Sequence, residues 1–261
     1  MKFGRFRHKS GEMREYYGTL STDKEKSFVN IIEKFDFNED LKYQYTGKQY
    51  QLDELEFLPP VNPSKIVAVG LNYKDHAAEM QKKLPEEPLL FIKPNSCVIP
   101  HLGTIIRPDA SQRVDYESEL AVVIRKTAKN VGKETADDYI FGYTCLNDVT
   151  ARDLQMKDVQ YTRAKGFDTF APIGPFIETE IENPSNLKIQ GRLNGELKQS
   201  SNTSNLIFNP FELVEFISGI MTLFPGDIIS TGTPSGVGSL KKDDIFEIEI
   251  ENIGKLKNFV E

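Results

Sequence analysis

Two glutamates separated by a single residue, Glu117 and Glu119, stand at the start of an apolar run that ends at Ile124. On a β-strand, residues two apart point to the same face, about 7 Å from each other. Two carboxylates held in this way repel each other unless a cation lies close to both. A solvated acidic face is the commoner explanation for such a pair. The apolar run, however, predicts burial on both faces of the strand, which favours a bound cation.

Asp148 is the third candidate ligand. Asp148, Arg152 and Gln155 are spaced i, i+4 and i+7, so on a helix they would share one face that joins an acid, a cation and an amide. Alternatively, Asp148 or Asn147 is the N-cap of a helix that begins near Val149. Three carboxylates without a histidine or cysteine suit Mg²⁺, Mn²⁺ or Ca²⁺ rather than zinc. The pattern therefore indicates a site in which Glu117, Glu119 and Asp148 hold a divalent cation such as Mg²⁺ or Mn²⁺.

His76 is followed three residues later by Glu79. One helical turn would let this carboxylate orient the imidazole, which is the arrangement that a general base needs. A lone histidine in a polar segment is more often an ordinary surface residue. The segment 74–88 is strongly charged and is bounded by Gly70 and by prolines, a pattern typical both of a mobile lid and of a plain surface loop.

Two further segments carry small polar or cationic residues. Ser230–Gly238, which contains Thr233, follows a short expected strand and could offer backbone N–H groups and hydroxyls to a carboxylate. A glycine-rich turn explains it equally well, and it lacks the Gly-Lys-Ser/Thr of a P-loop. Lys165 indicates nothing by itself. Cys97 and Cys145 are isolated in the sequence and form no zinc signature.

Strands must position most of these residues. A β-branched run stopped by glycine predicts a buried strand over Lys65–Gly70, and Asn194-Gly195 predicts a tight hairpin. Asn209 followed by Pro210 predicts the start of a helix that Pro225-Gly226 stops. Further strands are expected over 117–125, 140–146 and 245–260, the last with a turn at 252–254. We therefore predict an α+β fold with few helices rather than a doubly wound sheet.

The composition is that of an ordinary globular protein. The 261 residues are 39% hydrophobic and 27% charged, which is enough for a sizeable core. The formal net charge of −7 argues against nucleic acid or an anionic membrane as the main partner, but not against a small anionic substrate. No stretch is apolar enough to span a membrane, and no secretory signal is visible. We therefore expect a cytoplasmic protein with reduced thiols.

Three prolines, Pro59, Pro60 and Pro63, follow a polar first segment rich in lysine and glutamate. Prolines this close together cannot lie inside a helix or a central strand, so they indicate a linker. We place a domain boundary there. The expected organisation is a small N-terminal α/β domain over residues 1–60 and a catalytic domain over residues 61–261.

Taken together, these segments resemble the fumarylacetoacetate hydrolase family. The similarity covers about residues 61–240, and the motifs come in the family's order, which is far more specific than any one of them. Residues 1–60 are similar to the less constrained N-terminal extension of many bacterial and archaeal members. The matching stretches are Val69–His76, Phe91–Pro94, Asp115–Ala121, Gly142–Asp153, Ala164–Asp168 and Ser230–Pro234.

The resemblance implies a mixed β-roll, usually assembled as a homodimer, with a divalent metal bound by the two glutamates and the later aspartate. It implies that His76 and Glu79 form a catalytic dyad on a lid that orders when ligand binds. The tyrosine-degrading hydrolase of the family has another acidic ligand where this chain has Val69, which points to the branch with smaller substrates. The residues that match family positions in the substrate pocket are Arg152, Gln155, Lys165 and Thr233.

The expected substrate is a small anionic 2-oxo or enol acid. Bound through its carboxylate and keto oxygens, it would form an enolate on the metal, and Lys165 and Arg152 would offset the excess negative charge. We favour hydrolysis of a carbon–carbon bond in acylpyruvates, because His76 with Glu79 suits water activation. The alternatives are isomerisation of a 2-hydroxymuconate-type or 2-hydroxyhepta-2,4-diene-1,7-dioate-type diene and decarboxylation of an oxaloacetate-type acid. A metal-stabilised binding protein without turnover stays open as well.

Overall fold

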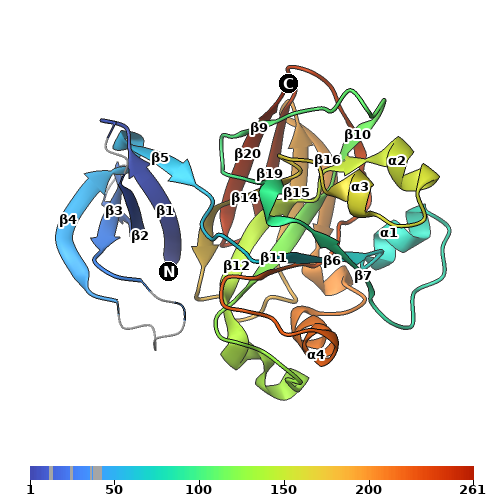
Figure 1. Cartoon of the computed structure of the whole chain (residues 1–261), viewed down its shortest axis with the longest axis horizontal. Coiled ribbons are helices and arrows are strands. Elements are labelled where there is room, and N and C mark those ends of the chain that lie inside the picture. The colour runs from blue at the N-terminus through green and yellow to red at the C-terminus, as the bar shows by residue number, and fades with distance from the viewer. Residues whose placement is uncertain (12–13, 24–25, 36, 38–42) are drawn as a thin grey trace.

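The computed structural model describes residues 1–11, 14–23, 26–35, 37 and 43–261. Most of these residues lie in strands, and the helices are short, as expected for an α+β fold with few helices. Figure 1 shows the first strands of the chain, in blue, as a separate layer at the left of the molecule. The remaining strands and the labelled α-helices form the larger body at the right.

The N-terminal layer consists of antiparallel strands. Strand β1 lies in its middle and pairs with both β2 and β5, while β3 joins β2 to β4. The described part of residues 1–60 contains a 3-10 helix and no α-helix, and the proposed division of the chain at residue 60 stays a prediction. The elements are β1 (Lys2–His8), β2 (Glu15–Asp23), β3 (Lys26–Ile32), β4 (Tyr45–Gln51), η1 (Leu52–Glu54) and β5 (Leu55–Leu58).

One large sheet runs through both parts of the molecule, because β1 pairs antiparallel with β14 at Lys2↔Glu178 and Phe3↔Ile177. Its order is β4-β3-β2-β1-β14-β12-β11-β17-β6-β7. Strands β11, β12 and β14 are buried at every residue, and for β11 the apolar run predicts this burial. The strands of the body are β6 (Ile66–Gly70), β7 (Leu89–Lys93), β11 (Ser118–Ile124), β12 (Ile140–Asn147), β14 (Ala171–Glu178) and β17 (Ile228–Ser230).

Two smaller sheets complete the body. The order of one is β16-β15-β19-β20-β9 and that of the other is β13-β10-β18. The first contributes Ile189, Ile248 and Leu256 to the same apolar core as Leu120 and Leu146 of the large sheet. Their strands are β9 (Thr104–Ile105), β10 (Val114–Tyr116), β13 (Thr150–Ala151), β15 (Lys188–Leu193), β16 (Glu196–Asn202), β18 (Gly238–Leu240), β19 (Ile245–Ile250) and β20 (Gly254–Val260). Strand β8 (Val98–Ile99) pairs with β14 and so belongs to the large sheet.

The predicted turn residues lie where the sequence puts them. Asn194 and Gly195 have φ values of 52° and 83° and connect β15 to β16, as a two-residue hairpin requires. The turn at 252–254 joins β19 to β20. The backbone N–H of Glu212 donates to the side chain of Asn209, which caps α4, but α4 ends at Ile220, before the expected stop at Pro225.

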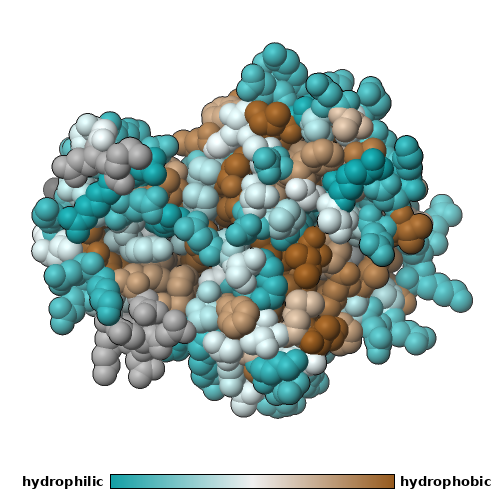
Figure 2. Space-filling model, in the orientation of Figure 1, coloured by the Kyte–Doolittle hydropathy of each residue, from teal (hydrophilic) through white to brown (hydrophobic). Residues whose placement is uncertain are grey.

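The other helices are one or two turns long. No helix among the described residues has the length and the apolar character that crossing a membrane requires. Figure 2 shows hydrophilic residues around the rim of this face and hydrophobic ones gathered toward its middle. The helices of the body are α1 (Lys74–Glu79), η2 (Asn95–Cys97), η3 (Lys133–Tyr139), α2 (Arg152–Lys157), α3 (Thr162–Lys165), η4 (Thr203–Asn205) and α4 (Pro210–Ile220).

Candidate active site

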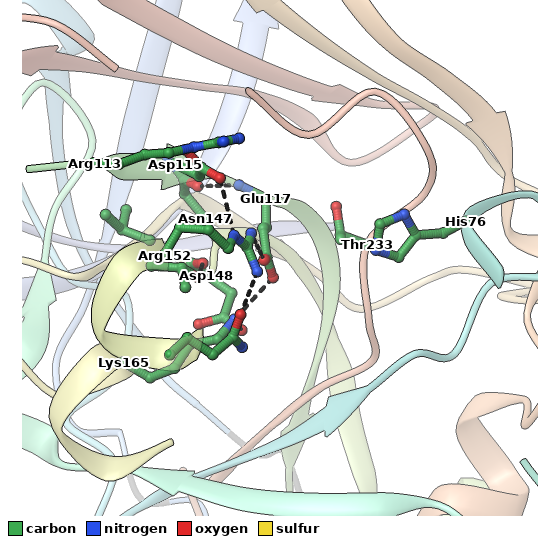
Figure 3. Close-up of polar contacts among 12 residues, drawn as sticks. His76, Arg113, Asp115, Glu117, Asn147, Asp148, Arg152, Lys165 and Thr233 are labelled. Atoms are coloured by element: carbon green, nitrogen blue, oxygen red, sulfur yellow. Dashed lines mark hydrogen bonds and ion pairs between the residues drawn. The ribbon is translucent and has the colours of Figure 1, made fainter. Parts of the chain in front are cut away.

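The three predicted carboxylates meet at one end of two paired strands. Glu117 directly precedes β11, Glu119 lies within it, and Asp148 directly follows β12. Because β11 and β12 are antiparallel with Ser118 opposite Asn147, the start of one strand lies beside the end of the other. Oxygen atoms of the three residues lie within 4.8 Å of one another, and all three side chains are buried. Figure 3 shows Glu117 and Asp148 converging from these two strands.

Asp148 does not share a helix with Arg152 and Gln155, so that prediction is wrong, as is the alternative that Asp148 caps a helix. Its backbone N–H donates to the carbonyl of Glu117 at 3.0 Å, and Thr150 then pairs with β10. These contacts hold the chain extended, and α2 begins only at Arg152. The three side chains nevertheless line the same cavity, because the extended segment returns α2 to the carboxylates.

Two cations neutralise Glu117. The amine of Lys165 donates to Oε2 of Glu117 at 2.8 Å and also to Oδ2 of Asp148. The guanidinium of Arg152 donates to Oε1 of Glu117 and, at 2.9 Å, to Oδ2 of Asp115. Burial would raise the pKa of Glu117, but Lys165 and Arg152 outweigh it and hold that pKa at about 2. Burial would lower the pKa of Lys165, but Asp148 and Glu117 raise it above its usual value.

Glu119 has a different environment. Its Oε2 accepts hydrogen bonds from the hydroxyl of Ser230 and from the backbone N–H of Gly232, at 2.8 Å for the latter. The loop that was expected to offer donors to a carboxylate thus offers them to the protein's own Glu119. Burial, followed by the negative charges of Asp148 and Glu117, raises the pKa of Glu119 to about 8. A nearby cation would favour its ionised form.

Two charged residues of the centre were not singled out from the sequence. Lys93, the last residue of β7, is fully buried and donates to Oδ1 of Asp148 at 2.6 Å. Asp115, also fully buried, accepts from Arg152 and, at 2.9 Å, from Arg113. Both residues lie inside stretches that carry the family resemblance. A lysine and an aspartate within apolar strands were the available signal, because such charges are buried only with a partner.

A cavity of about 150 Å³ opens beside the carboxylates. A larger hollow of about 690 Å³ lies between the N-terminal strands and residues 100–103, but none of the candidate residues lines it. The smaller cavity is therefore the candidate active site, because the charged side chains converge on it. The residues that line it are Val69, Gly70, Leu71, His76, Met80, Lys82, Leu89, Phe91, Glu117, Glu119, Asp148, Arg152, Gln155, Tyr161, Lys165 and Thr233.

His76 lies across this cavity from the carboxylates. It is on α1, and its Nδ1 lies 3.0 Å from Oε2 of Glu79, as the three-residue spacing predicts. Glu79 also accepts from the backbone N–H of Gly236 at 3.2 Å. In Figure 3, His76 and Thr233 lie on one side of the opening, and Glu117, Asp148 and Lys165 lie on the other. The site therefore has an acidic wall and a wall that carries an imidazole.

The donor set of the acidic wall fits a hard divalent cation. Its three ligand candidates are all carboxylates, and they are buried rather than solvated. Hard oxygen ligands suit Mg²⁺ and Mn²⁺, whereas zinc sites in proteins use mainly cysteine and histidine. Burial, and after it the negative charges of Asp148 and Glu117, raises the pKa of Glu119, and a bound cation would offset both effects.

Comparisons with known proteins agree with this architecture. A bovine protein named oxaloacetate tautomerase FAHD2B, mitochondrial, is 46% identical over 219 residues, which are 79% of this chain and 70% of that protein. The structure of 5-carboxymethyl-2-hydroxymuconate delta-isomerase from Mycobacterium smegmatis has a TM-score of 0.91 and 39% identity, covering 100% of this chain and 99% of that one.

A third relative is fumarylpyruvate hydrolase from Pseudomonas aeruginosa, whose structure is a complex with Mn²⁺ and pyruvate. It has a TM-score of 0.73 and 32% identity, covering 78% of this chain and 91% of that one. The family model described as fumarylacetoacetate (FAA) hydrolase C-terminal matches residues 65–261, three quarters of the chain and the whole of the candidate site. The chain therefore belongs to the fumarylacetoacetate hydrolase family, whose fold it shares.

Proposed function

We propose that this protein is a divalent-cation-dependent enzyme that moves a proton at the carbon next to the keto group of a small 2-oxo acid. The reaction that we place first is the interconversion of the keto and enol forms of such an acid. One observation carries the proposal: an imidazole held by a carboxylate, His76 with Glu79, faces a cluster of buried carboxylates across a single cavity.

Glu117, Glu119 and Asp148 are the residues that would hold the cation. When bound, Mg²⁺ or Mn²⁺ would supply Lewis-acid stabilisation of the negative charge that develops on the 2-oxygen of the substrate. Four carboxylates of the centre face four cations, so the fully ionised centre carries no net charge without metal. A divalent ion would make it positive and suited to an anionic substrate. The four carboxylates are Asp115, Glu117, Glu119 and Asp148, and the four cations are Lys93, Arg113, Arg152 and Lys165.

His76 is the proposed base. Its contact with Glu79 through Nδ1 favours the tautomer in which Nδ1 carries the hydrogen, so Nε2 is left with a lone pair. Nε2 would take a proton from C3 of the keto acid, which breaks the C3–H bond and leaves the electron pair delocalised to the 2-oxygen. Returning the proton to that oxygen gives the enol, so no other reactant is consumed.

The remaining polar residues would orient the substrate. Each of the three guanidinium nitrogens of Arg152 donates one hydrogen bond, to Asp115, Gln155 or Glu117. The remaining N–H groups of the guanidinium are available to bind an acid group of the substrate. Lys165 uses two of its three hydrogens. The volume of about 150 Å³ favours a short acid over a long one.

Hydrolysis of a carbon–carbon bond in acylpyruvates is the second candidate. The same imidazole could activate water, and the hydrolase from Pseudomonas aeruginosa was solved with Mn²⁺ and pyruvate. We rank it second because the bovine tautomerase is more similar, with 46% against 32% identity.

Isomerisation of a dienoate is the same kind of proton transfer over a longer path, and decarboxylation would use the same stabilised charge. A homodimer, a cytoplasmic location and the closing of 74–88 as a lid stay predictions.

The deciding experiment compares three substrates with the same protein sample. The enol form of oxaloacetate, acetylpyruvate and a 2-hydroxymuconate-type dienoate would be followed by their ultraviolet absorbance with Mn²⁺ and again after chelation. We expect faster decay of the enol, lost on chelation, with no release of acetate from acetylpyruvate. Faster release of acetate and pyruvate would favour the hydrolase. Turnover that survives chelation would contradict the proposed role of the cation.

A further inference from the structure

Two buried lysines contact the same carboxylate through different oxygens. Lys93 donates to Oδ1 of Asp148 at 2.6 Å, and Lys165 donates to Oδ2. Both side chains are almost completely excluded from water, with exposed fractions of 0% and 3%. They differ in one respect that bears on function, because Lys165 lines the cavity and Lys93 does not.

Lys93 anchors Asp148 to the main chain around it. Its amine also donates to the carbonyl of Val149 at 3.2 Å, so it bridges the carboxylate of one residue and the backbone of the next. This bridge restricts rotation of the Asp148 side chain and leaves Oδ2 directed to the other side. Because Lys93 does not reach the cavity, any effect it has on bound groups must pass through Asp148.

Lys165 instead joins two candidate ligands. Its amine contacts Oε2 of Glu117 and Oδ2 of Asp148, and it lies 5.1 Å from the centre of the Phe91 ring. A divalent cation held by these carboxylates needs oxygens of the same two residues. Lys165 and the divalent cation therefore compete for negative charge that cannot fully satisfy both.

We propose that the two lysines divide two roles between them. Lys93 is a positioning residue that holds Asp148 in the orientation in which it accepts a divalent cation, and it keeps this contact when the cation binds. Lys165 is an exchangeable cation that occupies Glu117 and Asp148 until the divalent cation takes its place beside them. This inference rests on the proposed metal site and assigns a separate role at that site to each lysine.

The test uses two variants with the same chemical change, Lys93→Met and Lys165→Met. Free Mn²⁺ would be titrated by its electron paramagnetic resonance signal, which measures affinity without any turnover. We expect Lys93→Met to weaken Mn²⁺ binding by about 10–100-fold, the usual cost of losing a partner that orients a metal ligand. We expect Lys165→Met to strengthen it by about tenfold, because a competing like charge is removed.

The opposite signs separate this inference from its rivals. If the lysines act only as background charge, both variants bind Mn²⁺ more tightly. If both are merely structural, both bind it more weakly. Either result would overturn the division of roles while leaving the metal site in place. A wild-type protein that does not bind Mn²⁺ would overturn the metal site and this inference together.

A second measurement uses the wild-type protein, so it does not depend on the stability of the variants. Crystal structures would be determined with and without Mg²⁺. We expect the amine of Lys93 to stay within hydrogen-bond distance of Oδ1 of Asp148 in both. We expect the amine of Lys165 to leave at least one of its two carboxylates when Mg²⁺ is bound. Loss of the Lys93 contact, or retention of both Lys165 contacts, would overturn the inference.

Discussion

Two buried clusters of the molecule are built in opposite ways. Where the N-terminal layer meets β14, aromatic rings pack on one another, with ring centroids 5.7 Å apart for Phe6 and Phe57 and 5.8 Å apart for Phe57 and Phe176. In the body, carboxylates are buried against lysine and arginine side chains. The first cluster obtains its stability from apolar surface removed from water, about 1.5–3 kcal/mol for each large side chain. The second must first overcome the cost of removing charges from water.

The difference indicates where the chain is built for stability and where it is built for chemistry. Burial of each ring of the aromatic cluster is favourable by itself and requires no bound ligand. Glu119, by contrast, has a pKa raised to about 8, so its ionised form is disfavoured until a cation reaches it. Substitutions in the carboxylate centre should therefore change binding and turnover, and substitutions in the aromatic cluster should change stability.

The largest effect is expected for Glu119→Gln. The amide oxygen can still accept from Ser230 and Gly232, and the neutral group resembles the protonated acid that predominates below pH 8. We therefore expect an unfolding free energy within about 1 kcal/mol of the wild type without metal. Mn²⁺ binding and turnover should both be lost, because the variant lacks one anionic ligand. Urea unfolding, Mn²⁺ titration and the enol assay measure the three quantities.

Glu196→Gln is the matched control, since Glu196 is exposed and pairs only with the nearby Lys198 among the described residues. It should leave affinity, turnover and stability unchanged. Turnover retained by Glu119→Gln would contradict the assignment of Glu119 as a ligand. A large loss of stability would contradict the view that this centre contributes little to folding.

The second effect concerns the opposite wall of the cavity. His76→Gln should lower turnover by about 10²–10⁴-fold, the usual contribution of a general base. Mn²⁺ affinity should be unchanged, because His76 contacts Glu79 rather than the carboxylate cluster. His8→Gln, at a partly buried histidine of the N-terminal layer that contacts Ser10 and Tyr50, is the control. Equal turnover of both variants would mean that His76 takes no part in the reaction.

The sequence predicted the parts of this site that depend on local pattern. The apolar run after Glu117 gave the correct buried strand, and the spacing of His76 and Glu79 gave the correct contact. The prediction of a helix around Asp148 is wrong because Thr150 pairs with Asp115, 35 positions earlier, and this pairing holds the segment extended. Pairing between distant segments can override a local helical pattern, and single-sequence periodicity does not contain it.

The features that the sequence did not predict also depend on contacts between distant segments. Lys93 meets Asp148 over 55 residues of sequence, and no local spacing links them. Residues 1–60 were predicted to form a small α/β domain but without the bounds of its strands, because strands such as β4 and β5 are partly exposed and give weak alternation. That β1 extends the main sheet by pairing with β14 at Glu178 depends on two segments more than 170 residues apart. The position of Lys93 beside Asp148 and that of β1 beside β14 therefore follow from the assembled sheet and not from local sequence.

The third effect falls on the aromatic cluster. Phe6→Ala should lower the unfolding free energy by about 3–5 kcal/mol, because a fully buried ring is replaced by a cavity. The value of kcat should be unchanged at temperatures where the variant is folded, since Phe6 lies in the N-terminal layer and does not line the small cavity. Urea unfolding and the enol assay test this pair of expectations. A fall in kcat greater than about twofold would mean that the two clusters are coupled.

The smallest effect is a pH dependence of stability at the junction of the two parts. His101 packs edge-on against Phe57 at 4.8 Å, and its Nδ1 accepts from the backbone N–H of Lys257 at 3.0 Å. Burial, with a smaller contribution from Lys257, lowers the pKa of His101 to about 4. In the unfolded chain the same ring takes up a proton near pH 6.5. Between these values the unfolded state binds more protons, so stability is complete above pH 6.5 and falls as the pH is lowered toward 4.

We expect this group to remove about 2 kcal/mol between pH 7 and pH 4.5, after allowance for the part of the ring that water reaches. His101→Gln can still accept from Lys257 but has no charge to gain, so it should lack this part of the pH dependence. Carboxylates also titrate in this range, and the difference between the two proteins isolates the histidine. Urea unfolding at the two pH values measures it. If both proteins lose the same stability, the junction does not depend on a neutral His101, and the pH sensitivity belongs to the charged centre instead.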